Sequence, residues 1–160
     1  GDNLEDMLGH RRFLMFYMAS SVGAALFHMA SDPWSLVPMV GASGAIAGVL
    51  GAYMLLYPKA RVDVLFFFWV FFKIWPIRAW LVLGLWFGLQ LLNGYGAQTD
   101  STGTAYWAHI GGFIVGALLI LPKWWALGGR AYWARAGGKP KQPDAPDFRP
   151  SSIPIIKRRR

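Results

Sequence analysis

Four long stretches of the chain are apolar and contain no Asp, Glu, Lys or Arg. They span residues 13–30, 36–57, 79–96 and 105–122. Each approaches the ~20 residues that a helix needs to cross the hydrocarbon core of a bilayer. We therefore predict an all-α fold, a polytopic membrane bundle with four transmembrane helices. The stretch ahead of the first span contains acids and lacks a basic start, which argues against a cleaved signal peptide.

A fifth apolar stretch, residues 61–77, is interrupted by Asp63, Lys73 and Pro76. Aromatic side chains with interspersed cations are typical of the headgroup level of a membrane. We expect this stretch to lie in the cytoplasmic interface, with Pro76 as a natural break ahead of the third span. The alternative is one long tilted helix that continues into that span.

The positive charges of the chain are confined to alternate loops. The net charge is +8, and all 16 Lys and Arg residues lie within 11–12, 59–78 and 123–160. Under the positive-inside rule these segments face the cytoplasm, and the base-free loops at 31–40 and 93–104 face outward. Because topology explains the basic charge, we expect the lipid bilayer, and no nucleic acid, as its partner.

Composition divides the 160 residues into a membrane domain over 1–125 and a basic, Pro-rich cytoplasmic tail over 126–160, which we predict to be disordered. The chain contains no Cys, which excludes disulfides, thiolate metal sites and a Cys nucleophile. It also offers only three scattered histidines and no H-E-x-x-H motif. We therefore expect neither a metal nor a cofactor.

Ser43 stands among glycines, alanines and aliphatic residues in the second span. On a helical projection it shares one side only with small residues, which are Gly44, Ala47, Gly48, Gly51 and Ala52. Such a strip lets another helix approach closely in a membrane. Packing alone would explain a lone serine at this position.

His109 lies on a matching strip in the last span, together with Ala105, Ala108, Gly112 and Gly116. An ionisable residue inside a span is costly and is a functional hypothesis by default, the alternative being a packed histidine bonded to a backbone carbonyl. Ser43 and His109 both lie near the outer ends of inward-running spans, hence at similar depth. The two strips would allow a Ser–His hydrogen bond, the arrangement of an activated nucleophile with its general base.

The third member of a catalytic triad is missing from the spans, because none of them contains a carboxylate. The residues therefore indicate a Ser/His dyad in which packing holds the imidazole, and transition-state stabilisation would come mainly from an oxyanion hole. Gly41 lets the chain bend there, so that the backbone N–H groups of Ala42 and Ser43 are presented at a helix start.

Two motifs of this chain resemble those of the rhomboid intramembrane serine proteases. They are "GASGAIAG" around Ser43 and "AHIGGFIVG" around His109, which match the G-x-S-G and A-H-x-x-G-x-x-x-G signatures of that family. The flanking stretches "GDNLEDMLGHRRFLMFY" and "RAWLVLGLWFGLQLLNG" are similar to bacterial members. The resemblance covers about residues 1–125.

The resemblance implies a bundle of six spans, of which this chain would be the C-terminal portion, because the two preceding spans and their H-x-x-x-N motif are not in it. It implies Ser43 as nucleophile and His109 as general base, with Gly41 and Gly44 in the nucleophile motif and Gly112 and Gly116 in the packing strip. The implied activity is cleavage of transmembrane protein substrates near a span end, in the bacterial inner membrane, without a cofactor.

Two other readings of the same chain remain. One is a catalytically inactive rhomboid-like protein that binds transmembrane clients, although such a binder would need neither Ser43 nor His109. The other is a fragment of a transporter or channel, for which the polar residues of the spans would line a path. These are only Ser43, Gln90, Asn93 and His109.

Overall fold

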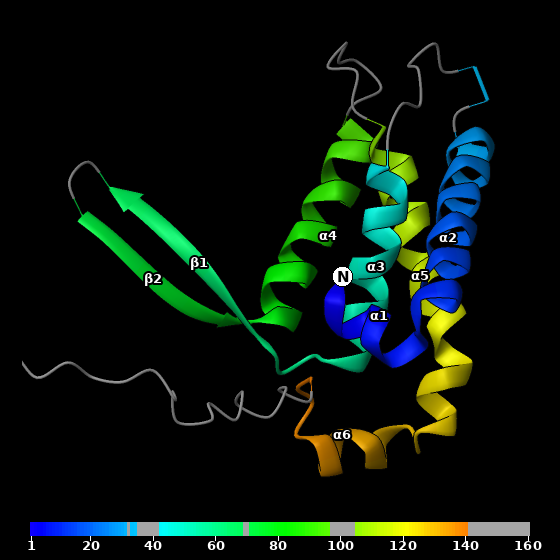
Figure 1. Cartoon of the computed structure of the whole chain (residues 1–160). Coiled ribbons are helices and arrows are strands. Elements are labelled where there is room, and N and C mark those ends of the chain that lie inside the picture. The colour runs from blue at the N-terminus through cyan, green and yellow to red at the C-terminus, as the bar shows by residue number, and fades with distance from the viewer. Residues whose placement is uncertain (32, 35–41, 69–70, 97–104, 141–160) are drawn as a thin grey trace, which may run out of the picture.

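The structure is a computed structural model, and it describes residues 1–31, 33–34, 42–68, 71–96 and 105–140. Within these residues the chain is mostly helical (Figure 1). The helices are α1 (Asp2–Leu8), α2 (His10–Ser31), α3 (Ser43–Leu56), α4 (Ala79–Gly96), α5 (Tyr106–Ala126) and α6 (Arg130–Ala136), and the strands are β1 (Arg61–Phe68) and β2 (Phe71–Arg78).

The bundle is formed by α2, α3, α4 and α5, which run side by side (Figure 1). Helices α2, α3 and α5 pack against one another, and α4 packs mainly against α5. Two of the helices, α2 and α5, are long and apolar enough to cross a membrane. Helix α3 has only 14 residues, and the segment 35–41 that precedes it lies outside the described residues.

Large apolar side chains cover the outer surface of the bundle. Each of the following is more than half exposed: Leu14, Met18 and Val22 of α2, and Leu85 and Leu92 of α4. Water is a poor solvent for such a surface, whereas lipid chains can cover it without cost. The helix surfaces are therefore of the kind that faces a bilayer.

Residues 61–78 form a two-stranded antiparallel hairpin that extends away from the bundle (Figure 1). The alternative of one long tilted helix is therefore wrong. Pro76 does not break a helix here but lies within β2, opposite Asp63. Strand β1 begins with β-branched residues alternating with charged ones, in "RVDV", and this period of two favours a strand over a helix.

The chain after residue 125 is not disordered as far as the structure describes it, so that prediction is wrong for residues 126–136. Helix α5 continues to Ala126, and the positive φ angles of Gly128 (105°) and Gly129 (56°) turn the chain into α6. There the Nε1–H of Trp133 donates to the carbonyl of Leu55 at 2.9 Å. Residues 141–160, on which the rest of the prediction falls, lie outside the described part.

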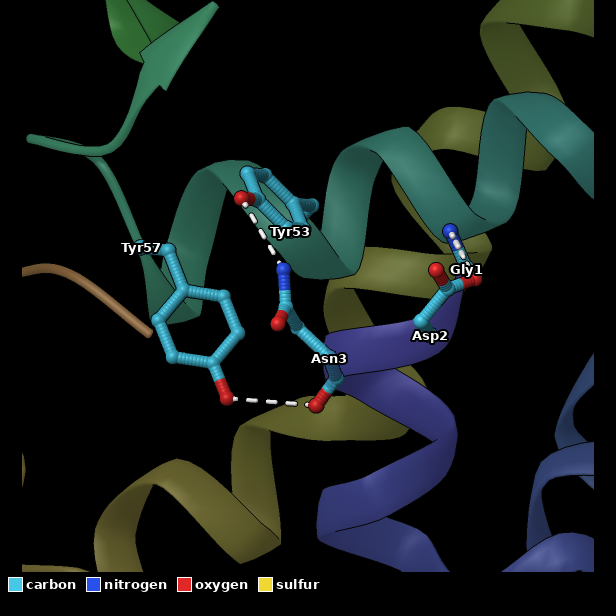
Figure 2. A network of polar contacts seen from close by, with 5 residues as sticks. All are labelled: Gly1, Asp2, Asn3, Tyr53 and Tyr57. Atoms are coloured by element: carbon cyan, nitrogen blue, oxygen red, sulfur yellow. Dashed lines mark hydrogen bonds and ion pairs between the residues drawn. The ribbon is translucent and has the colours of Figure 1, made fainter. Parts of the chain in front are cut away.

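Helix α1 is held against the last turn of α3 (Figure 2). The side-chain amide of Asn3 donates to the hydroxyl of Tyr53 at 3.5 Å, and the hydroxyl of Tyr57 donates to the carbonyl of Asn3 at 3.4 Å. Leu4 is fully buried in the same cluster. The hairpin, α6 and α1 thus gather at one end of the bundle, which we call the hairpin end.

Candidate active site

Ser43 is the first residue of α3. It does not lie at the end of the bundle but some distance along the bundle axis. Gly44, the next residue, packs against the Cβ of Ala24. Ala24 precedes the last residue of α2 by seven positions, which is about 10 Å along a helix axis. The side chain of Ser43 is exposed, while Gly44 is buried. Ser43 is therefore an exposed residue that lies about two helical turns below the end of α2.

Helices α3 and α5 touch backbone to backbone through their glycines. A Cβ built on Gly112 would overlap the carbonyl oxygen of Gly44, and one built on Gly116 would overlap that of Gly48. The same holds for Gly51 against the carbonyl of Phe113. The small-residue strips predicted on the two helices therefore face each other, as close helix packing in membranes requires.

This contact sets Ser43 and His109 at the same level. Gly44 lies against α5 between Ala108, whose carbonyl is 3.7 Å from a Cβ built on Gly44, and Gly112. Ser43 and His109 are the direct neighbours of Gly44 and Ala108 in the chain. The two candidate catalytic residues thus flank the same crossing of α3 and α5, one on each helix.

Helix α4 holds the imidazole of His109. Its Nδ1 is 2.9 Å from Oε1 of Gln90, and its ring centroid is 6.0 Å from that of Trp86. Trp86 and Gln90 are four residues apart and so lie on one face of α4. Gln90 is only 9% exposed. The sequence predicts that packing holds the imidazole but names no partner for it, and it predicts neither Trp86 nor the hydrogen bond to Gln90.

The backbone at the start of α3 provides the expected donors. Ala42 caps the helix, and its carbonyl accepts the N–H of Ile46 at 2.9 Å. The N–H groups of Ala42, Ser43 and the next two residues therefore precede the first intrahelical bond and have no acceptor within the helix. They also carry the positive end of the helix dipole. Gly41, which was expected to allow the bend, lies outside the described residues.

Other polar residues of the spans do not join the site. His28 is buried, and neither of its ring nitrogens has a partner within the described part of the chain. The same is true of the hydroxyl of Ser20, which packs against Gly48. Asn93 is exposed on α4. Within the described ranges, no three His, Asp or Glu side chains gather as metal ligands would.

Sequence reasoning named Gln90 only as a polar residue of a span and missed its contact with His109. The available signal was its spacing. Trp86, Gln90 and Gly94 recur every four residues along α4, and Gly94 also packs on α5, with Ile110 3.4 Å from a Cβ built on it. A polar residue in such a row points at the neighbouring helix and not at lipid. Which helix that would be could not be read from one sequence.

Comparison with known proteins gives the family. A family model described as a rhomboid domain matches residues 1–126. "Rhomboid protein 1, mitochondrial" of Saccharomyces cerevisiae is 34% identical over 122 residues, which are 74% of this chain and 33% of the relative. "Rhomboid protease GluP" of Bacillus subtilis is 35% identical over 130 residues, which are 81% of this chain and 23% of the relative. No solved structure matches.

The chain belongs to the rhomboid family, a family of membrane proteins that includes intramembrane serine proteases. It spans about a third or less of the length of the two relatives named above.

Proposed function

We propose that this protein is an intramembrane serine endopeptidase that cleaves transmembrane protein substrates near a span end. The observation that supports this most directly is the glycine-to-carbonyl contact of α3 with α5. It sets an exposed serine hydroxyl at the start of one helix level with a histidine on the other. Such a nucleophile and base, beside unpaired backbone N–H groups, are the parts that acyl transfer requires.

In the proposed mechanism the hydroxyl oxygen of Ser43 attacks the carbonyl carbon of the scissile peptide bond while Nε2 of His109 takes the hydroxyl proton. The negative charge that develops on the carbonyl oxygen is stabilised by the N–H groups of Ala42 and Ser43. The imidazolium then donates its proton to the leaving amine, and the C–N bond breaks. A water molecule, deprotonated by His109, hydrolyses the acyl-enzyme and restores the serine.

The proposed topology has four spans, α2 to α5, with the hairpin end in the cytoplasm. The Lys and Arg residues from 59 onward support this orientation, because those within the described ranges lie at that end, except Lys73, which is near the tip of the hairpin. The start of α3 then opens toward the outer side, and the basic tail is cytoplasmic. The similarity to a Bacillus subtilis protease supports a bacterial cell membrane as the location.

Labelling with a fluorophosphonate tests the nucleophile. The protein of full natural length, in detergent or in proteoliposomes, is treated with the probe, and the labelled peptide is identified by mass spectrometry. We expect the label on Ser43, because a serine beside a general base reacts with such probes. Ser20 on α2 is an internal control, since it is fully buried. A label on another serine, or none on a preparation that cleaves substrate, would contradict the proposal.

The inactive, client-binding reading makes a different prediction for the same experiment. It expects no labelling of the wild-type protein and no cleavage of any transmembrane substrate, while clients still copurify with both the wild type and Ser43→Ala. Labelling of Ser43 together with serine-dependent cleavage would exclude it.

A further inference from the structure

A hollow of about 440 Å³ lies at the hairpin end, and most of its lining residues are cationic. Four of its six lining residues are Lys59, Arg61, Arg78 and Lys139, and the other two are Pro76 and Gly137. The described residues contain two ion pairs, Gly1 with Asp2 and His10 with Glu5. None of the four cations is therefore paired within the part of the chain that the structure describes.

The fold brings these cations together from distant parts of the chain. Arg61 and Arg78 are directly opposite in the register of the hairpin, a position at which like charges are destabilising. The N–H of Lys59 donates to the carbonyl of Gly138 at 2.9 Å, which places Lys139 beside it. Gly137 and Gly138 make this return possible through their positive φ angles of 63° and 66°. A specific backbone turn thus assembles four charges that repel one another.

The chemistry of the hollow fits a phosphate group. Arginine binds phosphate through its planar fork of donors, and lysine does so as a point charge. The exposed apolar surface begins directly beside it, with Ile74 and Trp75 at 63% and 57% exposure on β2 and Leu81 at 48% on α4. In a membrane the boundary between cations and apolar surface lies at the headgroup level.

We propose that this hollow binds a phosphate-bearing anion, in the membrane the headgroup of an anionic lipid. Binding would neutralise the Arg61–Arg78 repulsion and fix the hairpin and α6 at the bilayer surface. Neither the proposed catalysis nor the positive-inside rule requires cations to be grouped around one cavity. Scattered cations in the cytoplasmic loops are enough to set the orientation of the spans. A lipid headgroup and free phosphate share this chemistry, and the experiment below separates them.

The test measures retained lipid by native mass spectrometry on the protein of full natural length, from nanodiscs of phosphatidylcholine with phosphatidylglycerol. Arg61→Gln with Arg78→Gln removes two charges from the hollow, and Lys73→Gln with Arg130→Gln removes two exposed charges outside it. We expect retained phosphatidylglycerol to fall about tenfold in the first variant and little in the second. Equal retention in both variants would overturn the proposal.

The second arm titrates inorganic phosphate in lipid-free detergent and follows thermal unfolding. Stabilisation that depends on Arg61 and Arg78 would support the phosphate site and assign its source to free phosphate. Stabilisation only by phosphatidylglycerol supports the lipid headgroup. If the hairpin variant does not fold, Lys59→Gln with Lys139→Gln takes its place. If that variant still retains phosphatidylglycerol and is still stabilised by phosphate, the proposal is also overturned.

A second inference concerns Gln90 and rests on the proposed protease function. Oxygen Oε1 of Gln90 can only accept, so the tautomer that makes a hydrogen bond of the 2.9 Å contact is the one with the imidazole proton on Nδ1 of His109. Nε2 is then unprotonated and free to accept the proton of the serine. This is the role that the aspartate has in a catalytic triad. We infer that Gln90 is the positioning residue of the dyad, which replaces the missing carboxylate.

Variants of Gln90 that keep or remove the acceptor test this role. Gln90→Met keeps the size but has no oxygen, and we expect kcat to fall roughly 10- to 100-fold at unchanged KM and thermal stability. Gln90→Glu again offers an oxygen and is expected to restore most of the lost kcat. Asn93→Leu, on the exposed face of α4, is the control. Unchanged kcat in Gln90→Met, or equal loss in Gln90→Glu, would overturn the inference.

The two proposals fail in different ways. If the wild-type protein neither labels on Ser43 nor cleaves substrate, the protease function is wrong. If cleavage depends on Ser43 but not on the acceptor at Gln90, only the positioning role is wrong.

Discussion

Ser43→Ala is expected to abolish cleavage of a transmembrane substrate, and His109→Ala is expected to have the same effect. Loss of a serine nucleophile or of its base typically costs on the order of 10⁴-fold or more in kcat. The structure leaves little room for a substitute. His28, on α2, is buried, and the other described histidine, His10, lies at the hairpin end of α2. The measurement is kcat/KM on a model substrate in proteoliposomes.

The double variant Ser43→Ala with His109→Ala separates a dyad from two independent effects. If Ser43 and His109 act as one catalytic unit, removing either residue already abolishes the activity that both provide. We therefore expect kcat/KM of the double variant to be no lower than that of either single variant. Ser21→Ala, on α2 and outside the site, should keep wild-type activity. Cleavage that survives Ser43→Ala would exclude the serine protease mechanism. Cleavage that survives His109→Ala but not Ser43→Ala would show that another residue is the general base.

Gly116→Ala is expected to destabilise the whole bundle. A single methyl group there would overlap the carbonyl oxygen of Gly48, and its nearest neighbours on α3 are backbone atoms that no rotamer change can move. Overpacking of this kind costs roughly 1–3 kcal/mol, and separation of the two backbones would also loosen every contact along the strip. We expect a lower midpoint of thermal unfolding in detergent and loss of activity in the same variant.

Gly88→Ala is the matched control for this prediction. Gly88 also lies within a helix, α4, but a Cβ built on it meets nothing within 4 Å. Because alanine is the better helix former by up to about 1 kcal/mol, this variant should be neutral or slightly more stable. Equal destabilisation of both variants would show that the α3–α5 contact is not the point at which the bundle is held together.

Predictions from the sequence succeeded for features that depend on the residue spacing within one helix. The row of small residues with Ser43 and the row with His109 could each be read from helical spacing, and the structure places them face to face. The prediction failed where the local pattern was ambiguous. Residues 61–78 are apolar but interrupted by charges, and the period-two alternation is confined to "RVDV" at their start, so the sequence did not predict the hairpin. The turn at Gly128 and Gly129, which leads into α6, lies in the stretch for which composition predicts disorder.

The sequence by itself determined which residues can do chemistry and which surfaces can approach, because residue type and helical period are local properties of the chain. Only the tertiary structure decided what stands next to them. Gln90 reaches His109 from a different helix, and Lys59 and Lys139 meet across 80 positions of the chain. Such contacts depend on how far each helix is rotated and shifted against its neighbours. That is set by the packing of whole helices, through the close backbone contacts at Gly44, Gly112 and Gly116.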